Sequence, residues 1–464
     1  MPSDDPSTEH PRALDVGLLS PLTVGAEEGL TDDAVLDALV AAEAALVHAL
    51  GARGLAPADT VAAIERALGW RGAGLTCHGH GLDARTLARA AVAGGNPVIP
   101  LVGLLKERVP AADRVWIHRG ATSQDILDSA LMRVAADSAA IVAETLARID
   151  AVLAALATAE SGTAAAARTL TQHGVPTTMG LRVANWRRGV RRAAERLDAA
   201  RAALPVQLGG AGGTLASFVE LFGPEGAAAL PAAYADALGL AAPDAPWHTS
   251  RWPVTELGDA LVQTVDALGK IATDVATLSR TEIGELAEGS GGGSSAMPQK
   301  QNPVASVLLR SAALRAPQLG ATLHLAAALA ADERPDGAWH AEWPTLRELL
   351  RLARGAAAHG ESLVTGLRVD HDAVARNLAL THGLIISERL SLVLTPVIGK
   401  DAVTAIVTAA GRGGDLRALV ADAVSAAGAA LDVDALLDPV QYLGLAPVLA
   451  ADAAPASPAP EEHA

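Results

Sequence analysis

The sequence has few aromatic, charged or cysteine residues. Phe, Tyr and Trp together make up 2% of the 464 residues, and charged residues make up 19%. Strand-rich folds favour aromatic and β-branched residues, so this shortage disfavours a β-rich fold. Cys77 is the single cysteine, which excludes an intramolecular disulfide and any multi-cysteine metal site.

Positive charge is scarce as well. Lys and Arg number 36 against 52 Asp and Glu, a formal net charge of −16. This balance argues against nucleic acid or an anionic membrane as a partner. No apolar run approaches the roughly 20 residues that span a bilayer, and the polar, acidic residues 1–12 do not resemble a secretory signal. We therefore expect a cytoplasmic protein.

Small aliphatic residues are what the sequence has in abundance. Half of it is hydrophobic, and this half consists mainly of Ala, Leu and Val. Ala and Leu are strong helix formers, and small side chains let helices approach closely. A chain of this length is expected to form two or three domains. The composition therefore predicts an all-α fold.

Apolar residues recur at alternating steps of three and four over long stretches, the pattern of one helix face. The longest stretches run from Asp125 to about Glu160, from Val254 to Glu285 and from Val304 to Ala330, where Pro317 is expected to kink or interrupt the helix. Broad stripes joined by long connections favour a bundle over a coiled coil. Shorter helices are expected after Thr31, which is a plausible N-cap, and at 60–68, 372–381, 384–396 and 400–410.

The segment 289–303, GSGGGSSAMPQKQNP, is the most informative. A glycine- and serine-rich run can be a flexible linker between two helices. Lysine, however, occurs only four times in the chain, and Lys300 is one of the four. Asn302-Pro303 then starts a helix, whose free N–H groups favour an anion. A phosphate loop fits poorly, because Lys300 is followed by a glutamine rather than Ser or Thr.

Residues Gly293 to Pro303, GSSAMPQKQNP, match every fixed position of a known pattern. They resemble the signature loop of the fumarase/aspartase superfamily. The resemblance implies that Ser294 is the catalytic base that works at carbon. It also implies that Lys300 and Asn302 help to hold a substrate carboxylate, and that donors activate the serine when the loop closes.

Residues 116–132, WIHRGATSQDILDSALM, resemble the first conserved region of the same superfamily. There, His, Thr and Ser line the pocket for the substrate's carboxylate. The resemblance therefore implies substrate-binding roles for His118, Thr122, Ser123 and Gln124. The alternative is that Thr122 or Ser123 merely caps the long helix that follows.

Residues 168–180, RTLTQHGVPTTMG, resemble the second conserved region with one departure. The usual histidine is Leu170 here, and a histidine follows three positions later at His173. Bacterial carboxymuconate cycloisomerases show the same displacement, whereas fumarases and argininosuccinate lyases keep the earlier histidine. His173 is either a catalytic residue or a structural one, and the sequence does not rank it against Ser294 as the group that delivers the proton.

Residues 332–345, DERPDGAWHAEWPT, contain the run Trp-His-Ala-Glu-Trp that resembles the cycloisomerase branch. Arg334 is expected to bind substrate, because its fork matches a carboxylate, and His340 is expected to contact substrate beside it. Trp339 and Trp343 either contact substrate or pack a helix junction. Weaker matches at 95–101, 207–215, 246–249 and 438–444 extend the resemblance over nearly the whole chain.

The resemblance implies a three-domain fold and a homotetramer whose active sites are shared between subunits. The expected parts are a small helical domain (1–115), a central long-helix bundle (116–366), a second small helical domain (367–450) and a disordered tail (451–464). The implied activity is lactonisation of the small polycarboxylate 3-carboxy-cis,cis-muconate, with no cofactor and no metal. An adenylosuccinate-lyase-like enzyme and an inactive, crystallin-like scaffold are the alternatives.

Overall fold

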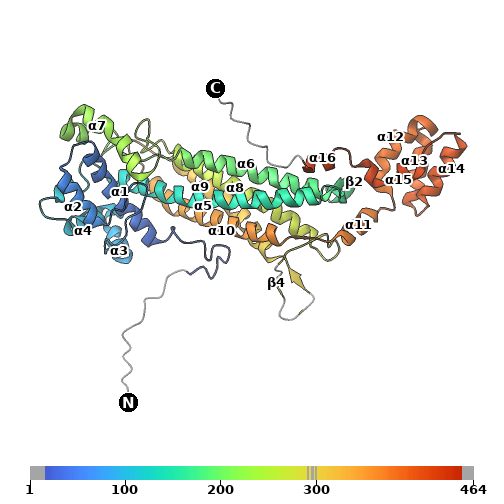
Figure 1. Cartoon of the computed structure of the whole chain (residues 1–464), viewed down its shortest axis with the longest axis horizontal. Helices are drawn as coiled ribbons and strands as arrows, with labels where there is room; N and C mark the ends of the chain where they lie inside the picture. Colours follow the sequence, from blue (N-terminus) through green and yellow to red (C-terminus); the bar gives the residue numbers. More distant parts are fainter. Residues whose placement is uncertain (1–15, 290–291, 294–296, 298–299, 452–464) are drawn as a thin grey trace, which may run out of the picture. The chain divides into compact units, whose positions relative to one another are not determined.

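The computed structural model describes residues 16–289, 292–293, 297 and 300–451, and helices dominate it (Figure 1). The chain forms two compact units. Unit 1 takes in the chain up to residue 145 together with 193–266 and 311–359; unit 2 takes in 146–192, 267–310 and 360 onward. The few strands are short, so the prediction of an all-α fold is confirmed.

Unit 1 contains a group of shorter helices built around α1 (Figure 1). They are α1 (Asp32–Ala52), α2 (Ala58–Leu68), α3 (Ala84–Gly94), α4 (Val98–Arg108) and α7 (Ala216–Leu238), with a 3₁₀ turn at Arg114–Trp116. Helix α1 packs against α2, α3 and α7. The hydroxyl of Thr31 accepts a hydrogen bond from the Ala34 N–H at 3.2 Å, so Thr31 is the N-cap of α1, as predicted.

Helix α1 corrects one expectation from the sequence. It is long and apolar enough to cross a membrane by length and composition, with a mean hydropathy of 1.7 in its best window. However, 72% of that window is buried inside the protein. Continuous burial against α2, α3 and α7 explains why α1 is apolar on nearly all sides, as a core helix is.

Five long helices contribute residues to both units. They are α5 (Ser123–Ala159), α6 (Met179–Ala202), α8 (Trp252–Leu278), α9 (Val304–Ala328) and α10 (Gly337–Gly366). In unit 2 a Cβ added at Gly360 of α10 would lie 2.9 Å from Leu268 of α8 and 3.4 Å from Ile149 of α5. Glycine at this position therefore lets three helices approach closely.

The predicted long helices agree with the structure except at two points. Helix α5 matches the predicted stretch closely, but α8 ends at Leu278, seven residues before Glu285. The chain turns there through Gly284, which has a φ of 66°, and the Glu285 N–H bonds to the Leu278 carbonyl at 2.9 Å. Helix α9 continues through Pro317, so the expected interruption is wrong.

Unit 2 contains an antiparallel hairpin that the sequence did not predict. Strand β1 (Ala164–Thr169) pairs with β2 (Gln172–Thr178), and the two turn residues, Leu170 and Thr171, have φ values of 48° and 72°. Two smaller pairs join β3 (Leu286–Ala287) to β6 (Arg368–Val369), and β4 (Gly292–Gly293) to β5 (Gln301–Asn302).

Unit 2 ends in a series of shorter helices (Figure 1), and all of them except α16 contribute to a second apolar core. They are α11 (His371–Ala379), α12 (Ser387–Ile398), α13 (Lys400–Gly411), α14 (Leu416–Ala426), α15 (Val433–Leu437) and α16 (Ala446–Ala451), with 3₁₀ turns at Leu384–Ile386 and Pro439–Tyr442. Ile386, Leu390 and Leu394 are fully buried at its centre. Ala166 of β1 belongs to the same core, which fixes the hairpin beside these helices.

Candidate active site

The turn that leads into α5 carries the first group of predicted site residues. His118 has a φ of 59°, and its backbone N–H and its Nδ1 both contact the buried carboxylate of Glu43, at 3.1 and 2.7 Å. Burial disfavours the charged imidazole, but the hydrogen bond and the charge of Glu43 outweigh it and raise the pKa of His118. The Glu43 carboxylate therefore fixes both the ring and the backbone of His118.

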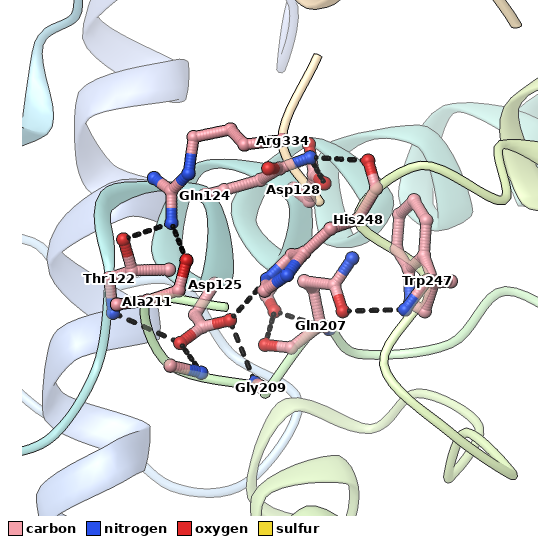
Figure 2. A network of polar contacts seen from close by, with 12 residues as sticks. Thr122, Gln124, Asp125, Asp128, Gln207, Gly209, Ala211, Trp247, His248 and Arg334 are labelled. Carbon is pink, nitrogen blue, oxygen red and sulfur yellow. Dashed lines mark hydrogen bonds and ion pairs between the residues drawn. The ribbon is translucent and has the colours of Figure 1, made fainter. Parts of the chain in front are cut away.

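Asp125, two residues into α5, holds the turn to a glycine-rich loop. Its buried carboxylate accepts from the N–H groups of Thr122, Gly209 and Gly210 at 2.9–3.0 Å (Figure 2). It also contacts His248 Nε2 at 2.9 Å. Four donors on one buried carboxylate make Asp125 the centre that positions Thr122 and the loop at 209–211.

Arg334 meets Thr122 across this turn. Its Nη2 donates to the Thr122 hydroxyl at 2.6 Å and to the carbonyl of Ala211 at 3.0 Å (Figure 2). Arg334 is half-buried, and no described residue bonds to its Nε or Nη1. The guanidinium thus has an anchored edge and further N–H groups that can hold a carboxylate.

Unit 1 also contains a buried ionic cluster. Arg251 donates to Asp128 at 2.7 and 3.1 Å and to Glu342 at 2.6–3.1 Å, and all three side chains are buried. Burial lowers the pKa of Arg251, but the two carboxylates outweigh it, so the net pKa rises. Trp339 Nε1 also donates to Asp128 at 2.8 Å, so Trp339 has a structural role.

The other predicted residues of unit 1 are less directly placed for a ligand. The amide of Gln124 is fully buried and donates to the His248 carbonyl at 2.9 Å and to Asp128 at 3.2 Å, so here it supports the network. Ser123 is the half-buried first residue of α5. Both ring nitrogens of His340 lie 2.9 Å from carbonyl oxygens, those of Asp336 and Gly95.

His173 lies in unit 2, on the hairpin. It is half-buried on β2 and pairs in register with Arg168 on β1. Burial, and then the charge of Arg168, lower the pKa of His173, while Glu285 acts weakly in the opposite direction. The neutral imidazole is therefore favoured near neutral pH, and in that state it can accept a proton.

The signature segment also lies in unit 2, and its described residues correct one expectation. Residue Ser294 is outside the described residues. Asn302 is half-buried and pairs with Gly292, and Lys300 is exposed. The buried carboxylate of Glu288 accepts from the N–H groups of Ala305 and Ser306 at 3.1 and 2.8 Å. Glu288 therefore occupies the N-terminus of α9, where the sequence suggested an external anion.

Several residues that support the predicted site residues were missed by reasoning from the sequence, among them Asp125 and Glu288. Asp125 had a local signal, because Thr122 and Asp125 have the spacing of a capping box. Glu288 had none, because it lies 17 residues before its first partner, Ala305. His248 stood within a weak match of the sequence, but nothing local indicated its contact with Asp125.

Taken separately, each unit offers hydrogen-bond donors and proton carriers. Unit 1 brings together Thr122 and Arg334, with His118 on the same turn, and unit 2 holds His173, Lys300 and Asn302. Within the described part of the chain, no three His, Cys, Asp or Glu side chains group as metal ligands do. Such donors suit the stabilisation of a charged oxygen by fixed hydrogen bonds.

Comparison with known proteins identifies similar enzymes over almost the full chain. A protein family described as lyase matches residues 87–317. Nitrosuccinate lyase from Streptomyces davaonensis is 45% identical over 461 residues, which cover 96% of this chain and 95% of that protein. The 3-carboxy-cis,cis-muconate cycloisomerase from Pseudomonas aeruginosa is 40% identical over 430 residues, which cover 90% of each.

Solved structures give the same picture. The 3-carboxy-cis,cis-muconate lactonizing enzyme from Pseudomonas putida superposes with a TM-score of 0.83 at 34% identity, over 92% of this chain and 96% of that one. A class II fumarase from Schistosoma mansoni has a TM-score of 0.68 at 17% identity, over 88% and 90% of the two chains. The fumarase shares the fold with this chain. A likeness at 17% identity does not show that the two proteins share a reaction.

Proposed function

Because the chain belongs to the fumarase/aspartase superfamily of lyases, we propose that it makes or breaks a bond β to a carboxylate in a small polycarboxylate. The reaction we favour is lactonisation of 3-carboxy-cis,cis-muconate to 4-carboxymuconolactone. Proteins named for this reaction are 34–40% identical to the chain over 81–90% of its length. The observation that supports a carboxylate substrate is the arrangement of Arg334. Its Nη2 is anchored by the Thr122 hydroxyl, and no described residue bonds to its Nε or Nη1.

The proposed step needs one bond to oxygen and one to hydrogen. A substrate carboxylate oxygen attacks one carbon of a double bond, and the π electrons move toward the carboxylate attached to the neighbouring carbon. The resulting aci-carboxylate then takes a proton at that carbon. Lys300, Asn302, Thr122, Ser123 and Arg334 are the donors we propose for the charged oxygens.

Ser294 and His173 are the candidates for the proton transfer. By microscopic reversibility, the residue that delivers the proton to carbon in the lactonisation is the residue that removes it in the reverse elimination. The lowered pKa of His173 suits it to accept a proton, which is the task in an elimination. Ser294 is supported by the resemblance of its loop alone, and we propose that it acts at carbon in the lactonisation.

A second candidate reaction is the elimination of nitrite from nitrosuccinate. The observation that favours it is the 45% identity over 461 residues to the nitrosuccinate lyase. Both reactions pass through a carbanion stabilised by an adjacent carboxylate, so the same donors serve both. In the reverse of the lactonisation, the leaving group is a carboxylate of the substrate. In the elimination from nitrosuccinate, the leaving group is nitrite.

One assay separates these reactions. The purified protein is given 3-carboxy-cis,cis-muconate, nitrosuccinate or adenylosuccinate under identical conditions, and substrate loss is followed by ultraviolet absorbance, with nitrite measured for the second substrate. We expect the highest kcat/KM with carboxymuconate. A higher value with nitrosuccinate would establish the second candidate, and no turnover of any of the three would support the inactive scaffold.

We also propose that the active sites are shared in a homotetramer. Helix α9 and the residue that follows it expose Leu314, Leu325 and Leu329, with 78%, 63% and 69% of their surfaces accessible. Their spacing of eleven and four residues places them on one face of a helix. A face of exposed leucines on a long helix fits burial against another copy of the chain.

A charge on this face is expected to dissociate the assembly. Leu314→Asp with Leu325→Asp should shift the mass measured by light scattering from about four times the 46.9 kDa chain toward the monomer. Activity should fall with it. Leu392→Asp on α12, where Leu392 is 66% exposed, is the matched control and should leave the tetramer intact. A fully active monomer would contradict shared sites.

The proposed chemistry also predicts an outcome for metal removal. The donors that we assign to the substrate are hydroxyls, an amide, a lysine and an arginine, and these do not form a cation site. Dialysis against a chelator should leave kcat/KM unchanged within about twofold, and added manganese or magnesium should not raise it. Activity that is lost on chelation and restored by one equivalent of a divalent ion would refute this mechanism.

A further inference from the structure

Unit 2 contains a cavity of about 370 Å³ whose lining includes none of the residues proposed above to bind substrate or to transfer the proton. It lies against the hairpin strand β1, helix α6 and helix α8, with Thr177 of β2 at its edge. Its charged lining residues are Arg168, Arg182, Lys270 and Asp274. This volume is within the range of small-molecule sites. We refer to it as the cationic cavity.

One side of the cationic cavity is electrically balanced. Asp274 accepts from Lys270 Nζ at 2.5 Å and from Trp186 Nε1 at 2.7 Å. Lys270 and Asp274 are one turn apart on α8, so they form an ordinary helix-surface pair. The Lys270 side chain nevertheless remains 65% exposed, which leaves its ammonium able to reach a ligand.

The other side has more positive charge than its partners neutralise. Arg168 is bound by both oxygens of Glu285, at 2.5 and 3.1 Å, and Asn377 donates to the same carboxylate at 2.9 Å. Arg182 comes no closer than 3.6 Å to Glu285, which is beyond hydrogen-bond distance. One carboxylate is therefore shared by two guanidinium groups.

Arg182 is the group that this arrangement leaves short of negative charge. Its side chain is 16% exposed, and its terminal nitrogens bond to neutral acceptors, the Ala166 carbonyl at 3.1 Å and the Met179 sulfur at 3.3 Å. Burial and the charge of Arg168 lower the pKa of Arg182, and the charges of Glu285 and Asp274 offset this only in part. A buried cation bonded to neutral acceptors is stabilised by an added anion.

We propose that the cationic cavity binds a small oxyanion, a carboxylate or a phosphate, at Arg182 and Lys270. Arg168, Arg182 and Lys270 carry three positive charges, whereas Asp274 and Glu285 carry two negative charges. The local excess of one positive charge fits one anionic group. The wall of Trp186 and Leu181 gives an apolar surface for a short carbon chain. Nothing in the lactonisation or elimination chemistry uses these residues, so the cavity is a second ligand site.

Calorimetric titration of the intact tetramer tests this site. Inorganic phosphate and succinate are titrated separately, so that the two sources of an oxyanion are distinguished. Arg182→Gln should weaken binding at least about tenfold, since a charged hydrogen-bond partner is lost. Lys270→Gln, at an exposed position that does not affect folding, should weaken it about two- to fivefold. Arg191→Gln on the exposed face of α6 is the matched control and should change nothing.

The variant Arg334→Gln separates binding at the candidate active site from binding at the cationic cavity. That variant should lose a succinate site there and keep the affinity that depends on Arg182 and Lys270. Thermal unfolding verifies that Arg182→Gln is folded. The proposal is overturned if neither phosphate nor succinate binding responds to Arg182→Gln or Lys270→Gln, or if all binding disappears in Arg334→Gln.

Discussion

Replacement of Ser294 by alanine is expected to reduce kcat by about 100- to 10,000-fold, the usual contribution of a positioned acid or base. The hydroxyl is the group that we propose to act at carbon, and alanine removes it without adding bulk. Steady-state kinetics on carboxymuconate measures the effect. KM should change less than kcat, because substrate carboxylates are held by other residues.

The matched control for this variant is Ser290→Ala, in the same glycine-rich segment but outside the signature. Ser290→Ala should keep kcat within about twofold of the wild type, as a change away from the reacting atoms does. If Ser294→Ala turns over normally, the proton transfer belongs to His173. The variant His173→Gln should then show the large loss instead.

Replacement of Arg251 by leucine is expected to lower the free energy of unfolding by about 3–5 kcal/mol. The change removes the partner of two buried carboxylates, Asp128 and Glu342, and leaves their charges without compensation. Urea unfolding followed by circular dichroism measures the loss. Arg89→Leu, at an exposed position on α3, is the control and should stay within about 0.5 kcal/mol.

The loss in the free energy of unfolding caused by Arg251→Leu should become smaller as the pH falls. Burial already raises the pKa of Glu342 in the native protein, even with Arg251 beside it. Without the guanidinium, the folded-state pKa of Glu342 rises further above its unfolded value. Protonation at low pH then stabilises the folded state, and this stabilisation is lost as the pH rises. A deficit that does not change with pH would assign the effect to lost packing around Arg251.

Three of the five long helices, α5, α8 and α9, could be predicted from local sequence, although α8 ends earlier than its pattern indicates; α6 and α10 were not predicted. In α5 an apolar face repeats over 37 residues without Gly or Pro, and this pattern needs no tertiary information. The hairpin at 164–178 was missed for the opposite reason. Its turn is formed by Leu170 and Thr171 in the left-handed region, where Asn or Gly would have signalled a turn. Packing of Ala166 against the C-terminal core stabilises what the local sequence does not indicate.

The candidate site was predicted as separate motifs and not as an arrangement. The contact of Thr122 with Arg334 joins positions 212 residues apart, which no local pattern reports. The supports of the site are harder still to predict. Asp125 gathers donors from Thr122, from the loop at 209–210 and from His248, and the contacts with the loop and with His248 depend on the completed fold. A resemblance to known motifs names the residues, whereas the structure supplies the reason for their positions.

The central claim is proton transfer at the carbon next to a carboxylate, and a reaction in deuterium oxide tests it most directly. The purified protein is mixed with 3-carboxy-cis,cis-muconate in deuterium oxide, and the product is followed by proton NMR. The account predicts a lactone that carries one deuterium, in a single stereochemical position, on the carbon beside the carboxylate. Unchanged substrate, with nitrosuccinate also unchanged in a parallel sample, would contradict it.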